Sequence, residues 1–399
     1  MSEIKHGLKE NWKQFTLLIF INALVGGMIG MERSIFPQYA SSVFGLTSNT
    51  VILTFVMAFG FTKAITNYFA GRFSNLLGRK NLLLLGWIFA IPVPFLLIFA
   101  NHWNWVIFAN ILLGISQGLT WSSTIIMKID LVGEKQRGLA MGFNEFSGYI
   151  SVGLVAFLSG YFATQYGITP YPFYIGIIIS ITGFFTTLIW VKDTKEFINK
   201  EKTTSSIQTI EKVFLTTSFR DKTLSSVTQA GLINNLNDGM MWGLFPILLF
   251  SLQYNYKSIG IITAIYPMVW GIGQLYTGKM ADQFNKKSIL FWGMFIQGLS
   301  IILLPILNSY AAFIGLSIFL GIGTAMVYPT FLVTIAEKTN PTQRAESIGV
   351  FRLWRDLGYV FGALLSGLTA DIFGIKTAII FTGILTLCSS GIIQWRMPK

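Results

Sequence analysis

Apolar runs of roughly 20 residues recur along the whole chain, and they restrict its possible folds more than any other feature. At 1.5 Å per residue, a helix of about 20 residues crosses the hydrocarbon core of a bilayer. Hydrophobic residues make up 53% of the 399 residues and charged residues only 12%. That is about half the charged fraction of a soluble domain. The sequence therefore predicts an all-α integral membrane protein.

Twelve such runs can be counted, and one polar, charge-rich stretch divides six of them from the other six. We predict an N-terminal six-helix bundle at 1–192, a linker on the membrane surface at 193–222, and a C-terminal six-helix bundle at 223–399. The predicted spans are 15–38, 47–70, 81–100, 105–128, 137–163, 171–192, 223–250, 257–277, 288–308, 311–336, 345–369 and 375–395.

One constant offset of 207 residues relates the two halves. It places Gly71–Lys80 on Gly278–Lys287, Arg137 on Arg344 and Gly167 on Gly374. An offset that holds over this length indicates a tandem duplication. The two bundles are therefore expected to be pseudo-symmetric. Glycines spaced four apart at 26 and 30, 114 and 118, and 358 and 362 are typical of helix packing in membranes.

Lysine and arginine are distributed unevenly between the loops. Most of the 29 lie in the two tails, the linker and the loops near 71–80, 128–137, 278–287 and 337–344. The loops on the other side hold only Lys257 and Lys376. The positive-inside rule places the richer side in the cytoplasm. We therefore expect a multi-pass protein of the cell membrane with both termini in the cytoplasm, and the net charge of +12 requires no nucleic acid.

The rarer residue types argue against catalytic and metal chemistry. Cys388 is the single cysteine, and the two histidines, His6 and His102, fall in polar ends of the predicted spans. An internal disulfide is excluded, and a cysteine-based metal site is not expected. We predict no enzyme activity, no cofactor, no metal and a monomeric protein, with the lipid bilayer and a small-molecule substrate as its partners.

The two basic loops resemble the loop motif of the major facilitator superfamily, which reads Gly, two variable positions, a small residue, Asp, two variable positions, Gly, Arg, and Arg or Lys. In the first copy, Asn75 replaces the family's Asp; the second keeps the acid as Asp282 but has Asn285 in place of the second glycine. A second family feature is an acid followed, seven positions on, by an arginine. It appears twice, as Asp130 with Arg137 and as Glu337 with Arg344.

This resemblance covers spans 1 to 12 and implies a fold and a mechanism. It implies twelve transmembrane helices in two pseudo-symmetric six-helix bundles that rock about a central site in alternating access. Spans 1, 4, 7 and 10 would surround the central cavity, spans 2, 5, 8 and 11 would flank it, and the remaining four would lie outside.

The charged residues of the two loops are expected to form a cytoplasmic gate. Exposed ion pairs are each worth only about 0–1 kcal/mol, which suits a latch that breaks in every cycle. The alternative is that these cations only set the topology. The predicted gate residues are Gly71, Asn75, Arg79, Lys80, Asp130, Arg137, Gly278, Asp282, Lys286, Lys287, Glu337 and Arg344.

Polar and aromatic side chains inside the inner and flanking spans are the candidates for substrate and proton binding. A charge within a bilayer costs at least about 2.5–3.5 kcal/mol, so it usually faces a cavity or a partner. Trp121 and Tyr328 are related by the offset and could hold a ligand from two sides, or could be ordinary packing residues. The candidates are Glu32, Arg33, Lys63, Gln117, Trp121, Glu145, Asn234, Asn237, Asp238, Trp242, Tyr328, Arg352, Arg355 and Asp356.

Among the acids, Glu32 and Asp238 are the leading candidates for a proton carrier. Desolvation favours a neutral carboxyl and a nearby cation favours a carboxylate, so a carboxyl that alternates between such environments can couple protons to transport. The alternative is a structural salt bridge, for example between Glu32 and Arg33 or Lys63. Glu145 and Arg352 occupy equivalent positions in the two halves, which suggests a charge pair between the bundles.

The sequence therefore predicts a secondary active transporter that moves a small organic solute across the cytoplasmic membrane, coupled to protons, in the manner of drug and metabolite exporters. An ion-independent facilitator, a metabolite importer, and a transporter-like receptor or scaffold without flux remain open. Two features common in drug antiporters are missing: Asn110 stands where an arginine is frequent, and Gly148–Gly153 lacks their Gly-Pro pair. The near balance of acids and bases within the spans fits a zwitterionic or amphipathic solute.

Overall fold

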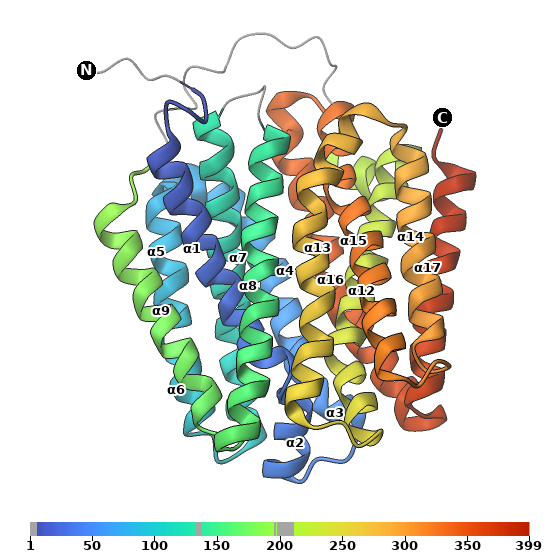
Figure 1. The fold of residues 1–399 in the computed structure, drawn as a ribbon. Coiled ribbons are helices and arrows are strands. Elements are labelled where there is room, and N and C mark those ends of the chain that lie inside the picture. The colour runs from blue at the N-terminus through green and yellow to red at the C-terminus, as the bar shows by residue number, and fades with distance from the viewer. Residues whose placement is uncertain (1–5, 133–136, 195–196, 198–210, 399) are drawn as a thin grey trace.

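The computed structural model describes residues 6–132, 137–194, 197 and 211–398, and it shows a molecule built almost entirely of helices (Figure 1). Only the backbone is described for residues 71–76, 137–139, 282, 283, 341, 342, 344 and 345. Asn75, Arg137, Asp282 and Arg344 fall in this set, so their predicted side-chain roles lie outside the described residues.

The first half of the chain contains nine helices within the described residues, two of them short. They are α1 (Trp12–Arg33), α2 (Phe36–Phe44), α3 (Asn49–Ile52), α4 (Thr54–Leu77), α5 (Arg79–Ala90), α6 (Pro92–Ile98), α7 (Trp103–Val132), α8 (Arg137–Tyr166) and α9 (Tyr171–Trp190).

The second half begins with two short helices from the predicted linker and continues with six long ones. The elements are α11 (Val213–Leu215), the π-helix η2 (Thr216–Arg220), α12 (Lys222–Ser251), α13 (Tyr256–Gln283), α14 (Lys286–Leu303), α15 (Tyr310–Lys338), α16 (Pro341–Phe373) and α17 (Ile375–Arg396). The described part of the linker is thus helical at its C-terminal end, whereas the two boundaries between the three predicted segments stay a prediction.

Proline interrupts two of the predicted spans. The first was expected to run to residue 38, but α1 ends at Arg33 and α2 begins at Phe36, with Pro37 in its first turn. The third span is divided at Ile91, after which Pro92 begins α6. Proline lacks the N–H that would continue the hydrogen-bond ladder, and it disfavours helical geometry in the residue before it. The break after α1 leaves Glu32 and Arg33 at a helix end.

Ten helical stretches of the described chain are long and apolar enough to cross a membrane, with α5 and α6 counted as one. The other two long helices, α4 and α12, are of similar length but more polar. They contain Lys63 and Asp238, two of the predicted site residues. Helices that line a cavity rather than lipid can tolerate such residues, so the twelve predicted spans each correspond to a helical stretch.

The start of α1 and the end of α17 lie at the same end of the molecule, which we call the terminal face; α2 and α3 lie at the other end, the opposite face (Figure 1). The two halves meet chiefly where α8 packs along α13 and where α4 packs along α16. The α8–α13 contact runs from Gly142 beside Gln274 to Gly160 beside Tyr256. These helices therefore stay in contact from near the terminal face to near the opposite face.

The glycine pairs predicted for helix packing are at close helix crossings. A Cβ atom on Gly26 would lie 2.1 Å from the carbonyl oxygen of Gly148, and one on Gly358 would lie 2.3 Å from that of Leu232. A Cβ atom on Gly118 would lie 2.6 Å from the Cβ of Thr66. These glycines let the backbones within each half approach more closely than any side chain would permit.

Candidate functional site

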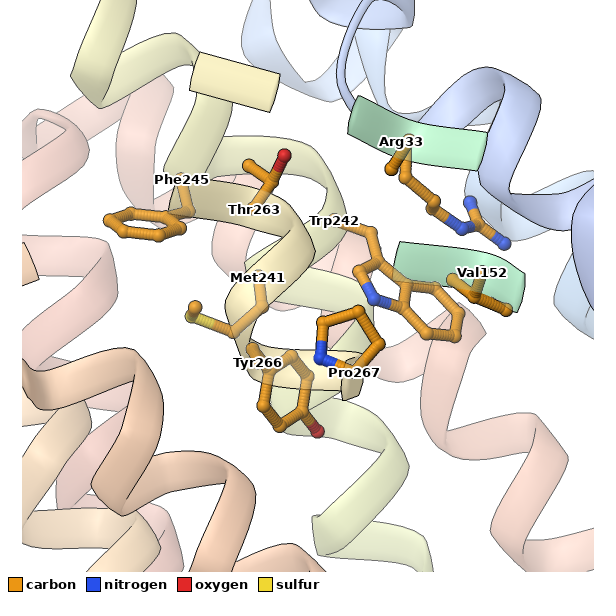
Figure 2. A pocket seen from close by; sticks show the side chains of 9 residues that line it. Arg33, Val152, Met241, Trp242, Phe245, Thr263, Tyr266 and Pro267 are labelled. Carbon is orange, nitrogen blue, oxygen red and sulfur yellow. The ribbon is translucent and has the colours of Figure 1, made fainter. Parts of the chain in front are cut away.

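The first cavity lies between the two halves and is lined mostly by apolar side chains. It has a volume of about 350 Å³, and we call it the Arg33 cavity. Figure 2 shows the guanidinium of Arg33 beside the indole ring of Trp242 at one side of this cavity. Its lining residues are Arg33, Val152, Ala156, Met241, Trp242, Phe245, Thr263, Tyr266 and Pro267.

Arg33 is held by aromatic rings rather than by hydrogen bonds. Its guanidinium carbon lies 3.9 Å from the ring centroid of Trp242 and 5.2 Å from that of Phe59. Within the described residues, none of its three side-chain nitrogens has a hydrogen-bond partner. Contact with aromatic faces stabilises a cation by about 0.5–2 kcal/mol, which leaves the donors of Arg33 available to a ligand.

Two buried carboxyl groups accompany this cavity, one from each half. Glu32 and Asp238 are both fully buried. Tyr266, which lines the Arg33 cavity, donates a hydrogen bond to Asp238 Oδ1. Glu32 has no cation within 4.0 Å among the described residues, so the alternative of a salt bridge to Arg33 or Lys63 is wrong for this conformation.

A second cavity, of about 280 Å³, is polar and rich in cations; we call it the Lys63 cavity. Trp121 and Tyr328, the aromatic pair predicted from the internal repeat, both line it. Arg355 lies 4.3 Å from the ring centroid of Tyr328, and the Nζ of Lys63 lies 5.7 Å from that of Trp121. The lining residues are Lys63, Asn67, Trp121, Ser122, Tyr149, Tyr328, Arg352 and Arg355.

Aromatic rings separate the two cavities. Tyr359 stacks on Trp242 with 4.9 Å between ring centroids, and the Nζ of Lys63 lies 5.3 Å from the same tyrosine ring. A second group of rings lies between the cavities. Tyr149, which lines the Lys63 cavity, stacks on Trp270, and Trp270 stacks on Tyr266, which lines the Arg33 cavity. The central space is therefore divided rather than continuous.

The cavities lie at different depths. Arg352 is eleven residues into α16, and Trp242 is twenty residues into α12. At 1.5 Å per residue these positions are about 16 Å and about 30 Å from the helix ends at the terminal face. The Lys63 cavity thus lies nearer to the terminal face and the Arg33 cavity nearer to the opposite face.

Polar side chains also join the two halves directly. Asn67 of α4 donates to Asp356 of α16, and Nη1 of Arg352 donates to the hydroxyl of Ser122 over 3.0 Å. Asp356 further accepts from Asn235 and pairs with Arg355 at 3.4 Å. Asp356 is therefore the centre of a polar network beside the Lys63 cavity.

The predicted charge pair between Glu145 and Arg352 is not formed. Glu145 instead accepts hydrogen bonds from the indole of Trp121 and the amide of Asn144, each over 2.9 Å. Because Arg352 donates to Ser122, each of the two residues bonds to neutral groups. The interpretation from the repeat was wrong because equivalent positions in two halves need not face one another.

Three of the other predicted site residues contribute to packing within one half. The amide of Gln117 donates to the carbonyl of Val25 on α1. Asn237 donates to Gln297 and accepts from Thr386. Asn234 donates to its neighbour Asn235 over 3.3 Å. None of the three lines either of the two cavities described above.

Within each half, one predicted gate pair is present at the terminal face. Arg79 lies 3.4 Å from Asp130, and Lys286 lies 3.0 Å from Glu337. Each pair joins two helices of the same half. Lys80 differs from the expectation, because its Nζ donates to the carbonyl of Leu188.

The turns of the two basic loops start later than the sequence suggested. Gly71 and Gly278 lie inside α4 and α13, which continue to Leu77 and Gln283. In the first loop the chain turns at Gly78, which has a φ of 87° that favours glycine. In the second loop, Asn285 caps α14 by accepting a hydrogen bond from the backbone N–H of Ser288.

At the opposite face, Asp371 forms a contact between the halves that sequence reasoning missed. Its carboxylate accepts from the hydroxyl of Ser48, the backbone and side chain of Asn49 and the backbone of Thr50, over 2.7 to 3.0 Å. The 207-residue offset relates Asp371 to Thr164, so the repeat gave no sign of it. Asp371 thus holds the start of α3 against α16.

Comparisons with known proteins agree with this architecture. A family model described as Major Facilitator Superfamily matches residues 16–226 and 227–399. The proton-coupled antiporter flippase LtaA of Staphylococcus haemolyticus is 24% identical over 382 residues, which is 92% of this chain and 88% of that protein. The multidrug resistance protein MdtG of Proteus mirabilis is 24% identical over 385 residues, 93% of each chain.

Among solved structures, the human organic anion transporter MFSD10 (TETRAN) superposes with a TM-score of 0.72 at 13% sequence identity, over 96% of this chain and 99% of that one. This likeness concerns the fold. The family model and the helices together confirm the predicted fold class of two six-helix bundles. The chain belongs to the Major Facilitator Superfamily, and it is a multi-pass membrane transporter rather than an enzyme.

Proposed function

We propose that this transporter exports a small amphipathic organic solute across the cytoplasmic membrane in exchange for protons, with the terminal face in the cytoplasm. The observation that carries the proposal is the pair of fully buried carboxyl groups, Glu32 and Asp238, one from each half beside the Arg33 cavity. Relatives named as a proton-coupled antiporter flippase and as a multidrug resistance protein support export and proton coupling.

Too few hydrogen-bond donors surround Glu32 to stabilise its carboxylate form in this conformation. Both of its carboxyl oxygens lack a hydrogen-bond partner among the described residues, although the side-chain amide of Asn110 lies beside the carboxyl group. Burial of a carboxylate without such partners is costly, and a protonated Glu32 could itself donate to a neighbouring acceptor. Glu32 is therefore assigned a bound proton in this closed conformation.

Asp238 differs from Glu32 because it accepts a hydrogen bond, from Tyr266. Tyr266 donates to its Oδ1, while its Oδ2 has no donor among the described residues. Arg33, Lys63 and Arg355 are the cations that act on it. A ligand anion that engages these cations would weaken their hold on the carboxylate and favour its protonation. Binding of the solute and protonation of Asp238 can therefore influence one another.

Contacts between the halves support a mechanism of alternating access. The closed conformation is held at the opposite face by Asp371 and in the centre by Asn67 with Asp356. The ion pairs Arg79–Asp130 and Lys286–Glu337 keep each half rigid near the terminal face. The two halves, working as a monomer, rock so that the cavities open to one side of the membrane at a time.

Transport by purified protein in liposomes tests this function. The solute to use is the one that most raises the melting temperature of the detergent-solubilised protein among aromatic anions, cations and zwitterions. A pH gradient of the appropriate sign is expected to drive solute accumulation, and Glu32→Gln with Asp238→Asn is expected to abolish that drive. Flux that ignores the gradient in the wild type would instead identify a facilitator. Binding without flux would identify a receptor.

A further inference from the structure

Uncompensated positive charge is concentrated around the Lys63 cavity. Three cations, Lys63, Arg352 and Arg355, line it, and no acid is among its lining residues. Asp356 pairs with Arg355 at 3.4 Å, but no carboxylate of the described chain lies within 4.0 Å of Lys63 or Arg352. Lys63 is only 6% exposed. A desolvated cation without a partner is destabilising, so the cavity has the charge of an anion site.

The donors of these cations are free to bind a ligand. In the described part of the chain, Nε of Arg352 and both Nε and Nη2 of Arg355 have no hydrogen-bond partner, although Arg355 is only 5% exposed. Guanidinium groups present paired N–H donors that match the oxygens of phosphate, sulfonate and carboxylate groups. Two guanidinium groups and one ammonium group therefore converge on a single space.

A further acid near this set, Glu145, forms no ion pair with it among the described residues. Glu145 lies on α8 beside Trp121, but its Oε1 accepts from Trp121 and Asn144. It does not line the Lys63 cavity. With Asp356 committed to Arg355 and to the amides of Asn67 and Asn235, the cavity keeps a net positive charge.

The aromatic rings of the lining indicate what the rest of the ligand is like. Trp121, Tyr149 and Tyr328 form part of the wall of the Lys63 cavity, and such rings favour an aromatic or other flat apolar body.

We propose that the Lys63 cavity binds the anionic group of an aromatic organic anion, such as an aryl phosphate, sulfonate or carboxylate. That this anion is the transported solute rests on the proposed function, whereas its binding does not. An aromatic anion of this kind is amphipathic, as the sequence predicts for the solute, but it is not a zwitterion.

Equilibrium binding to the purified full-length protein in a non-ionic detergent tests the proposal. The probes are 1-naphthyl phosphate, naphthalene-1-sulfonate, the neutral 1-naphthol, the cationic 1-naphthylmethylammonium and inorganic phosphate. We expect the two aromatic anions to bind at least about tenfold more tightly than the other three, because charge-assisted hydrogen bonds are the strong ones. Equal or tighter binding of the neutral, the cationic or the inorganic probe would overturn the proposal.

Substitutions then locate the site. Lys63→Gln and Arg352→Gln are each expected to weaken binding of 1-naphthyl phosphate about tenfold, with Arg352→Lys in between. Lys257→Gln, which removes an exposed cation at the start of α13, is the matched control and should leave the dissociation constant unchanged. Undiminished binding in both glutamine variants would refute the assignment.

The unliganded proteins provide a second readout that separates ligand binding from a structural role. Removal of an uncompensated buried cation is expected to leave the melting temperature of Lys63→Gln unchanged or raised. A clear fall in that temperature would show that Lys63 is already paired in the resting protein, against the proposal. Because no membrane or pH gradient is involved, anion binding can fail while proton-coupled export stands, and the reverse also holds.

Discussion

Asp238 accepts a hydrogen bond from Tyr266, and the ring of that tyrosine lines the same cavity as the guanidinium of Arg33. A buried carboxyl of the C-terminal half is thus connected, through one phenol group, to a cavity that residues of both halves line. Under the proposed function, this connection would let a solute in the cavity influence the protonation of a group that it does not touch.

The first prediction concerns Asp238 itself. Asp238→Asn should abolish solute accumulation driven by a pH gradient while solute exchange at equal pH continues, because an amide cannot carry the proton. Uptake into proteoliposomes with and without the gradient measures this. The matched control is Asp221→Asn on the same helix; Asp221 caps α12, and asparagine caps equally well. Equal loss of coupling in both variants would contradict the assignment.

The second prediction concerns the contact at the opposite face. Asp371→Ala removes the acceptor for Ser48, Asn49 and Thr50, so the opposite face should open more often. In a protein with Cys388→Ser and Val152→Cys, the rate of thiol labelling in the Arg33 cavity should rise several-fold. Lys376→Gln on the same face should leave the rate unchanged. No increase in labelling with Asp371→Ala would show that this contact does not keep the face closed.

The third prediction compares the two ion pairs at the terminal face. The side chains of Arg79 and Asp130 are 5% and 12% exposed, against 22% and 56% for Lys286 and Glu337. Thr194 also donates to Asp130. Asp130→Asn should therefore cost about 1–3 kcal/mol and Glu337→Gln about 0–1 kcal/mol. Thermal melting in detergent measures both, and an equal or larger loss for Glu337→Gln would contradict the argument.

The fourth prediction uses helix packing. A methyl group on Gly358 would meet the carbonyl of Leu232 at 2.3 Å, whereas one on Gly391 would have nothing within 4 Å. Gly358→Ala should destabilise the protein by about 1–3 kcal/mol through overpacking. Gly391→Ala should be neutral or stabilising by up to about 1 kcal/mol, because alanine favours the helix. Comparable melting temperatures for the two variants would show that α12 and α16 can separate without cost.

Much of the fold could be predicted from the sequence because a bilayer imposes strong constraints. Long apolar runs must become spanning helices, and the duplicated loops relate one half to the other. The break after Arg33 was not predicted, although Glu32, Arg33 and Ser34 interrupt the apolar run just before Pro37. The exact turns of the basic loops depended on local geometry at Gly78 and Asn285, which the duplicated pattern does not show.

The candidate site was predictable where it carries charge, where it repeats an aromatic residue, or where an aromatic residue follows a polar run within a span, as Trp242 does. Arg33, Lys63, Arg355 and the pair Trp121 and Tyr328 all line one of the two cavities. The apolar part of the lining could not be identified in the same way. An apolar residue such as Val152 has the same sequence pattern whether it faces a cavity or lipid.

Tyr266, Tyr149 and Tyr359 were missed for a related reason. None of the three carries a charge, and each acquires its role through a contact with another helix: Tyr149 stacks on Trp270, Tyr359 stacks on Trp242, and Tyr266 donates to Asp238. For Lys128, in contrast, the sequence suggested exposure where the structure shows burial. Its position suggested a cytoplasmic loop, but it is fully buried and donates to the carbonyl of Leu18. Such contacts depend on how helices distant in sequence are oriented.

Proton movement during solute exchange tests the central claim most directly. Purified protein is reconstituted into liposomes that contain a pH-sensitive dye, and the strongest-binding solute of the panel is added outside at equal pH on both sides. The wild type is expected to move protons opposite to the solute, and the double variant Glu32→Gln, Asp238→Asn to move solute without protons. Proton movement that persists in the double variant, or is absent from the wild type while solute flows, would contradict the account.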